Sequence, residues 1–219
     1  MTVPRMQDYY AARAPEYDRI YSKPERQDDL RQIEAWLPPT FAGASVLEVA
    51  CGTGYWTQFI APVATQVVAV DAAPDTMRIA QGRPANRHVE FIEGDAYALT
   101  SVLGARRLQR GFAGFWFSHV PRSRLPKFLL GFNAALEPGA TVVLLDNLYV
   151  EGSSTPISET DDEGNTYQAR RLGDGTTHRL IKNFPSEQEL RADTAGLATR
   201  VTYKTWQYYW ALSYVTAGT

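Results

Sequence analysis

The chain has one cysteine, Cys51, among its 219 residues, and three histidines. A single cysteine excludes an internal disulfide and a zinc site built from several thiolates, and we expect no metal site. No stretch is apolar for long enough to span a bilayer, and residues 1–5 do not resemble the start of a secretion signal. We therefore expect a cytoplasmic protein without a membrane partner.

The charge is nearly balanced, with 22 basic and 24 acidic residues and a formal net charge of −2. Such a balance gives no general field that would gather nucleic acid, so we expect no nucleic-acid partner. There is no internal repeat or low-complexity tract. The length suits one large domain over residues 1–219, in a monomer or homodimer.

The central feature is an apolar strand that runs into a glycine turn and then a short helix, Val46–Tyr55. Gly52 and Gly54 permit positive φ and a close approach of a ligand to the backbone, and the new helix begins with unpaired N–H groups. The third glycine of a dinucleotide-binding fingerprint is missing, because Thr57 stands in its place. No glycine-rich phosphate loop ending in Gly-Lys-Ser or Gly-Lys-Thr occurs.

Acidic residues follow the next two predicted strands. Asp71 ends the apolar run Val67–Asp71, about 20 residues after the glycine turn, where a carboxylate can bind a ribose diol; a helix cap before Pro74 is the alternative. Asp95 ends a third strand within Val89–Ala96. Ligands of open α/β sheets lie at the carboxyl ends of strands, so we expect these acids to share one cleft with Glu48.

The segments E-V-A-C-G-T-G (48–54), Y-Y-A-A-R-A-P-E-Y-D (9–18), G-D-A (94–96) and L-E-P-G-A (136–140) resemble those of class I S-adenosylmethionine-dependent methyltransferases. This resemblance implies an α/β Rossmann-like fold with a seven-stranded, mostly parallel sheet of order 3-2-1-4-5-7-6, whose last strand is antiparallel. It also implies S-adenosyl-L-methionine as cofactor. The residues that it places at the cofactor are Tyr17, Glu48, Ala50, Cys51, Gly52, Gly54, Trp56, Asp71, Ala72, Met77, Gly94, Asp95, Ala96, Phe117 and Ser118.

The spacing of apolar residues and the positions of proline and glycine predict most of the remaining helices and strands. We expect a bent helical lid within 1–40, a helix over 24–37 that Pro38 and Pro39 stop, and a fourth strand over 111–117. The stripe from Leu125 to Leu136 predicts a core-packing helix, closed by residues 137–139, before a fifth strand over 140–146. Ser186 and Glu189 predict a capping box, and two runs over 198–206 and 208–215 predict a final hairpin.

An insertion over 148–185 departs from the plain fold. Two strand-like runs flank Gly173–Gly175 and predict a β-hairpin. Its basic residues, Arg170, Arg171, Arg179 and Lys182, form either a solvated face or, if one side turns inward, a site for an anionic group of a substrate. We expect this hairpin, residues 166–182, to select the substrate.

The predicted reaction is methyl transfer to an O or N atom of a small-molecule acceptor. His119, after the fourth strand, is the leading candidate for a base because imidazole titrates near neutral pH; Tyr10, Tyr17 and Asp146 are alternatives, and His119 could instead only pack or cap. RNA methylation, a nicotinamide-dependent oxidoreductase and a non-catalytic cofactor-binding protein are the competing functions.

Overall fold

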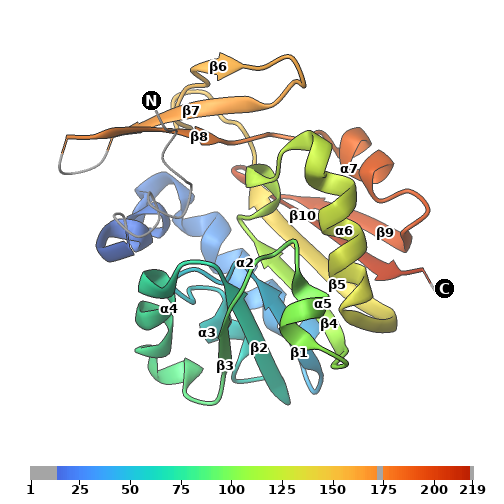
Figure 1. Cartoon of the computed structure of the whole chain (residues 1–219). Helices are drawn as coiled ribbons and strands as arrows, with labels where there is room; N and C mark the ends of the chain where they lie inside the picture. Colours follow the sequence, from blue (N-terminus) through green and yellow to red (C-terminus); the bar gives the residue numbers. More distant parts are fainter. Residues whose placement is uncertain (1–13, 172–174, 218–219) are drawn as a thin grey trace.

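A seven-stranded sheet forms the centre of the molecule (Figure 1). The computed structural model describes residues 14–171 and 175–217. The strand order is β3-β2-β1-β4-β5-β10-β9; β1 to β5 are parallel, and β10 is antiparallel to both β5 and β9. The predicted fold class and strand order are confirmed. The strands are β1 (Ser45–Val49), β2 (Gln66–Asp71), β3 (Glu90–Glu93), β4 (Leu108–Gly114), β5 (Leu136–Asn147), β9 (Ala198–Thr205) and β10 (Tyr209–Thr216).

Helices cover both faces of this sheet, because successive side chains of each buried strand point to opposite sides. On one face Val46 and Phe112 pack with α2 (Gln27–Phe41), α3 (Thr57–Ile60) and α4 (Pro74–Gln81). On the other face Leu47 and Ala113 pack with α5 (Leu99–Leu103), α6 (Leu125–Ala134) and α7 (Glu187–Asp193). The 3-10 helices are η1 (Ala14–Ser22), η2 (Pro24–Arg26), η3 (Pro84–Asn86), η4 (Phe117–His119) and η5 (Arg122–Arg124).

The predicted stop at Pro38 and Pro39 is wrong, since α2 continues to Phe41 with both prolines inside it. Proline removes backbone donors from a helix, but Leu37 and Phe41 lie four residues apart on the same face. Both side chains are fully buried. Their burial outweighs the lost hydrogen bonds, so the helix keeps its last turn.

Two further boundaries differ from the prediction. Strand β5 begins at Leu136, so residues 137–139 start the strand and do not close the preceding helix. Strand β4 ends at Gly114, because Phe115 has a φ of 59° that a strand cannot continue. The backbone therefore turns three residues earlier than the aromatic run 111–117 suggested.

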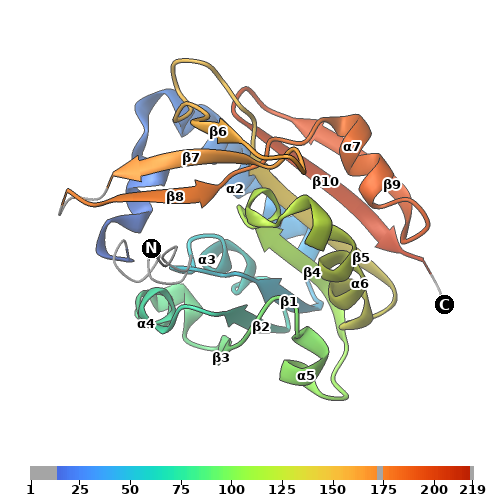
Figure 2. The same ribbon diagram turned by 45° about the horizontal axis from the view of Figure 1, so that its top comes forward.

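The insertion forms a second, three-stranded antiparallel sheet of β6 (Glu159–Thr160), β7 (Thr166–Arg171) and β8 (Thr177–Ile181). The predicted hairpin is thus confirmed. Figures 1 and 2 show this sheet beyond one end of the main sheet, next to the amino-terminal helical segment. The Asn183 N–H donates to the Ser118 carbonyl at 2.7 Å, which joins the end of the hairpin to η4.

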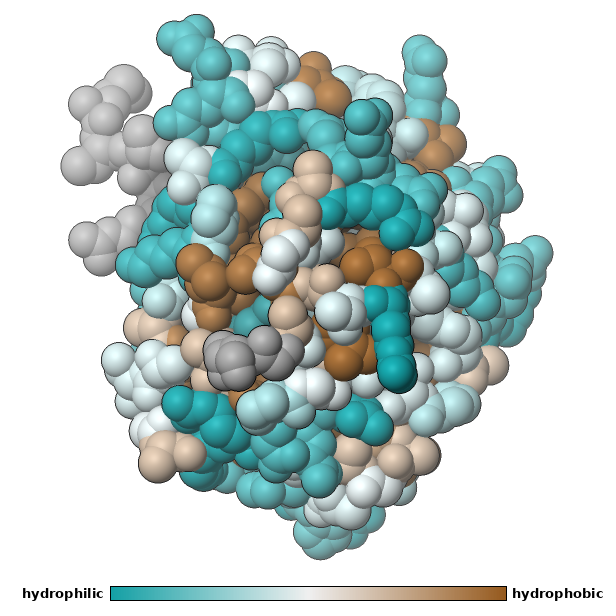
Figure 3. All heavy atoms as spheres, turned by 90° about the vertical axis from the view of Figure 1, so that its right-hand side faces the viewer, coloured by the Kyte–Doolittle hydropathy of each residue, from teal (hydrophilic) through white to brown (hydrophobic). Residues whose placement is uncertain are grey.

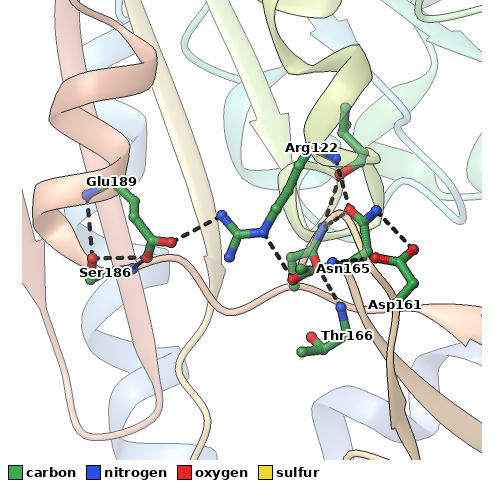
Figure 4. A network of polar contacts seen from close by, with 9 residues as sticks. Arg122, Asp161, Asn165, Thr166, Ser186 and Glu189 are labelled. Carbon is green, nitrogen blue, oxygen red and sulfur yellow. Dashed lines mark hydrogen bonds and ion pairs between the residues drawn. The ribbon is translucent and has the colours of Figure 1, made fainter.

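Arg122 of η5 is the centre of a polar network that fixes the insertion (Figure 4). Its guanidinium donates to the Gly164 carbonyl at 3.0 Å and to Glu189 of α7 at 2.9 Å, and its N–H donates to Asn165 Oδ1 at 2.8 Å. The capping box of Ser186 and Glu189 is present as predicted. One side chain therefore joins a loop of the main domain, the insertion and α7.

The surface is mixed in character. On the face in Figure 3, hydrophobic residues gather near the middle within a border of hydrophilic ones. Across the described residues, the exposed large apolar side chains are Leu130, Tyr149 and Ile157, a number that is ordinary for a folded chain. None of the helices in the described ranges combines the length and the apolar character that crossing a membrane requires.

Candidate active site

The glycine turn after β1 has the left-handed backbone that its sequence predicted. Gly52 and Gly54 have φ of 54° and 69°, and Ala50 reaches 55° despite its Cβ. Asp71, at the tip of β2, accepts from the Gly52 N–H at 2.7 Å and from the Ala73 N–H at 2.8 Å. Burial raises the pKa of the Asp71 carboxyl, and these hydrogen bonds oppose the rise. Asp71 thus holds the turn in shape.

A cavity of about 340 Å³, called here the larger cavity, opens at the carboxyl ends of β1 to β4. Seven of the predicted cofactor residues line it: Ala50, Gly52, Asp71, Ala72, Gly94, Asp95 and Ala96. The other lining residues are Val70, Ala73, Thr76, Tyr97, Gly114, Phe115, Trp116, His119, Pro121 and Arg124. The carboxylates of Asp71 and Asp95 therefore share one space, as their positions at neighbouring strand tips predicted.

A second cavity of about 90 Å³, called here the smaller cavity, lies between the main sheet, the amino-terminal segment and the insertion. Phe115 and His119 line both cavities. The remaining lining residues are Ile20, Lys23, Arg26, Asn147, Ser153, Ser154, Thr155, Gln168, Arg170, Leu180, Lys182, Phe184 and Tyr209. The two spaces thus meet at Phe115, which follows β4, and at His119 of η4.

Comparison with known proteins agrees with this geometry. A family model described as "Methyltransferase domain" matches residues 46–139, which include the glycine turn and both acidic strand tips. A structure described as a DhpI–SAH complex is 27% identical, with a TM-score of 0.78, and the match covers 96% of this chain and 95% of that one. The chain is a class I S-adenosylmethionine-dependent methyltransferase.

Other solved structures extend the likeness of this methyltransferase. A DhpI–SAM–HEP complex is 28% identical, with a TM-score of 0.74 and coverage of 94% of both chains. An S-adenosylmethionine-dependent methyltransferase from Clostridium acetobutylicum ATCC 824 shares the fold at 15% identity, with a TM-score of 0.66 and coverage of 94% and 99%. No match was found among curated protein sequences.

Glu48 of the methyltransferase lies beneath the glycine turn and does not line either cavity. Its side chain is buried, and its Oε2 has no hydrogen-bond partner within the described structure. Burial raises its pKa to about 8, the nearby Thr57 hydroxyl lowers it, and the charge of Asp71 raises it further. An acidic side chain with an unsatisfied oxygen therefore stands directly behind the turn.

Six other predicted cofactor residues lie outside the lining of the larger cavity: Cys51, Gly54, Trp56, Met77, Phe117 and Ser118. Most of them pack in the core, and burial raises the pKa of the Cys51 thiol. A Cβ on Gly54 would lie 2.7 Å from Asn86 Nδ2 and 2.8 Å from Ala80 Cβ. Gly54 is therefore needed for close packing of the turn against α4 and η3.

The predicted tyrosine candidates cannot be placed, since Tyr10 and the side chain of Tyr17 lie outside the described residues. Their neighbours in η1 do contact the turn. Thr53 Oγ1 donates to Asp18 at 2.6 Å, Arg83 forms an ion pair with Asp18, and Tyr21 stacks on Tyr55 at 3.5 Å. The amino-terminal segment is thereby joined to the glycine turn.

His119 is buried between the two cavities and uncharged. Its Nδ1 lies 2.7 Å from the Ile181 carbonyl, which can only accept, so the proton is assigned to Nδ1 and the lone pair to Nε2. Burial lowers the pKa of His119 to about 3, and the charge of Lys182 adds to this, while Asp146 opposes it. The imidazole is therefore a hydrogen-bond acceptor at neutral pH and a weak base.

Asp146 is fully engaged at the end of β5. It accepts from Lys182 Nζ at 2.8 Å, from the Ser118 N–H at 3.0 Å and from the Asn147 N–H at 2.8 Å. Burial alone raises the pKa of this carboxyl, but the Lys182 charge and these hydrogen bonds outweigh it and the pKa is lowered. Asp146 thus anchors the end of the hairpin to the methyltransferase core.

The four basic residues of the hairpin divide between two sides. Arg179 forms an ion pair with Glu159 at 2.8 Å over the Tyr167 ring, and Arg171 is exposed. Arg170 and Lys182 line the smaller cavity. One side of the hairpin is therefore solvated and the other turns inward.

Sequence reasoning missed the aromatic residues Tyr97, Phe115 and Trp116, and the basic residues Lys23, Arg26 and Arg124. Tyr97 directly follows the Gly-Asp-Ala run, so its position was a usable signal. Phe115 and Trp116 lie where the strand was expected to continue. The basic residues belong to helices and loops whose approach to the cavities is decided by packing, and no local pattern marks them.

Proposed function

We propose that this methyltransferase moves the methyl group of S-adenosyl-L-methionine to an O or N atom of a small-molecule acceptor. The cofactor occupies the larger cavity and the acceptor the smaller one. The observation that carries this proposal is the shared boundary of the two cavities at Phe115 and His119. Only at such a boundary can two bound molecules meet while water is kept from most of their surfaces.

The donors and acceptors of the larger cavity suit the cofactor. Asp71 is a strand-tip carboxylate, with lone pairs left for a ribose diol beside its two backbone bonds. Asp95, which also accepts from the Tyr97 N–H at 2.9 Å, suits the exocyclic amine of adenine. The unpartnered Oε2 of Glu48 is an acceptor behind the turn that suits the amino group at the methionine end.

When bound, the cofactor supplies a methyl group on a positively charged sulfur, ready for in-line displacement. The task of the chain is to hold the acceptor atom near and in line, which is a large share of the barrier. Phe115 shapes the boundary, and His119 Nε2 accepts a hydrogen bond that orients the acceptor. Asp146 acts through Lys182 and Ser118 as a positioning residue.

The amino-terminal segment completes a single domain in this proposal. Tyr10 and Tyr17 belong to a lid over 1–40, and the contacts of Asp18 and Tyr21 with the turn support a closing role. The insertion, 148–185, provides one wall of the smaller cavity through Gln168, Arg170 and Lys182. It therefore takes part in choosing the acceptor.

Calorimetry on Asp71→Asn tests the cofactor site. The amide loses the charge and one acceptor atom, so we expect affinity for S-adenosyl-L-methionine to fall by about tenfold or more. Asp75→Asn is the matched control, because Asp75 is four residues away and pairs with Arg78 at the surface. Equal affinities for wild type and Asp71→Asn would contradict the assignment.

A second experiment tests the reaction. The enzyme is incubated with a metabolite extract and cofactor carrying an isotopically labelled methyl group, and products are found by mass spectrometry. We expect label in one small molecule. Label found in RNA, or in nothing while the cofactor binds, would contradict a small-molecule methyltransferase.

A further inference from the structure

The smaller cavity has an excess of positive charge. Lys23, Arg26, Arg170 and Lys182 all line it, and none of its lining residues within the described chain is acidic. Lys182 is neutralised by Asp146 at 2.8 Å. Lys23 has Glu25 at 3.9 Å, on an exposed edge. Arg26 is left as the main source of the excess.

Arg26 is the most telling of these residues. It is only 6% exposed, and its guanidinium donates to Ser153 Oγ at 3.1 and 3.0 Å while lying over the Tyr208 ring at 5.0 Å. In the described structure no carboxylate lies within ion-pair distance of it. Glu25 reaches it only through Ser153, whose Oγ donates to Glu25 Oε1 at 2.8 Å. A buried charge without a direct counterion is costly, and such a charge at a cavity wall points to a counterion that arrives with a ligand.

The cationic groups also act on one another. Burial lowers the pKa of Lys23, and the neighbouring charges of Arg26 and Arg170 lower it further. Burial likewise lowers the pKa of Lys182, where Asp146 opposes the change and both arginines add to it. Lys23, Arg26 and Arg170 repel one another around one small space, and an anion placed among them would stabilise each of them.

Uncharged hydrogen-bonding groups complete the wall. Ser153, Ser154, Thr155, Asn147 and Gln168 border the same space. Ser153 Oγ already donates to Glu25 at 2.8 Å, and Gln168 Nε2 donates to the Thr155 carbonyl at 2.5 Å. The Asn147 amide and the Thr155 hydroxyl are the donors that suit the oxygens of an oxyanion beside the guanidinium.

We propose that the acceptor is a small organic oxyanion whose charged group binds Arg26, Arg170 and Lys23 in the smaller cavity. This inference rests on the proposed function, and it adds the chemical class of the substrate. The proposal assigns selection of the acceptor to η2 and to the inner side of the hairpin. The residues at the cavity boundary, Phe115 and His119, then face the part of the anion nearest to the cofactor.

Calorimetry with simple anions tests the proposal on the full chain with S-adenosylhomocysteine bound. The probes are inorganic phosphate and acetate, with sodium chloride at equal ionic strength and neutral acetamide as controls. We expect at least one probe to bind with one-to-one stoichiometry and Arg26→Met to weaken it by about tenfold or more. Arg191→Met should leave it unchanged, because Arg191 pairs with Glu187 on the exposed side of α7.

Arg170→Met gives a second route if Arg26→Met does not fold, since Arg170 is only partly buried on the hairpin; it should weaken the same probe. Binding of neither probe above the chloride control, or equal affinity in the arginine variants, would overturn the inference. Cofactor affinity is measured on every sample. If wild type binds the cofactor normally but binds no oxyanion, only this inference is wrong. If wild type does not bind the cofactor, the proposed function is wrong.

The experiment with the labelled extract tests the charge of the acceptor independently. After an anion-exchange step at neutral pH, the labelled product's precursor should be found among retained metabolites. Removal of the retained fraction before incubation should therefore abolish labelling. Labelling that survives this removal would show that the acceptor is neutral or cationic, against the proposal.

Discussion

Phe115 shows how one strained residue organises this site. Its φ of 59° is unusual for a bulky side chain, and backbone strain of this kind costs about 1–3 kcal/mol. Neighbouring groups hold Phe115 in this conformation. Its N–H donates to the Leu145 carbonyl at 2.7 Å, and its ring lies between Tyr21 at 5.7 Å and Tyr209 at 5.6 Å. The ring is thereby held at the boundary of both cavities.

Glu48 carries a prediction at the same scale. Its folded pKa of about 8 lies above its ordinary value of 4.5, so the folded state holds a proton that the unfolded state releases. Stability from this group is complete below about pH 4.5 and is lost as the pH rises through 8. Glu48→Gln does not titrate at this position, so this contribution to the pH dependence should be absent from the variant.

The measurement is urea unfolding of the cofactor-free enzyme at pH 5, 7 and 9. Between the two pKa values, wild type should lose up to about 1.4 kcal/mol per pH unit relative to Glu48→Gln. Exposed Glu93 provides the control, Glu93→Gln. Parallel pH profiles for wild type and Glu48→Gln would show that the buried carboxyl does not titrate as stated. Cofactor affinity of Glu48→Gln should fall, in line with its proposed contact.

At the scale of elements, the second sheet is positioned by a few polar side chains. Lys182 joins its last strand to Asp146, and Asn183 Nδ2 donates to the Val120 carbonyl at 3.1 Å. Arg122 joins its first loop to α7 (Figure 4). The wall of the smaller cavity therefore depends in part on Arg122 and Asn183, which do not line that cavity.

Arg122→Met tests this dependence. Loss of the two guanidinium hydrogen bonds, to the Gly164 carbonyl and to Glu189, should destabilise the insertion by about 1–3 kcal/mol, seen as faster hydrogen exchange over 159–183. Arg191→Met removes an exposed i,i+4 pair and should cost no more than about 0.5 kcal/mol. Unchanged exchange in Arg122→Met would mean that other contacts suffice to hold the second sheet.

At the scale of the molecule, the two cavities belong to different parts of the chain. The larger cavity is lined by segments that follow β1 to β4, with no lining residue from 148–185. The smaller cavity takes residues from both the amino-terminal segment and the insertion. In the proposed function, cofactor binding and acceptor binding should therefore be separable.

Deletion of residues 151–183, joined by a short Gly-Ser linker, tests this separation. Asp146→Asn accompanies the deletion, because the loss of Lys182 would leave a buried unpaired charge. Calorimetry should find affinity for S-adenosylhomocysteine unchanged within about twofold, while oxyanion binding disappears. The single Asp146→Asn variant is the control, and a folded deletion variant that no longer binds S-adenosylhomocysteine would contradict the division.

Local sequence determined the sheet, the glycine turn and the acids at the strand tips, because periodicity, turn chemistry and strand-end position act over a few residues. It did not determine where α2 ends, since packing of Phe41 overrides Pro38 and Pro39. Nor did it determine which hairpin arginine faces inward, or that Lys23 and Arg26 reach the same cavity. Those facts depend on how segments far apart in the sequence pack together, and only the tertiary structure decides them.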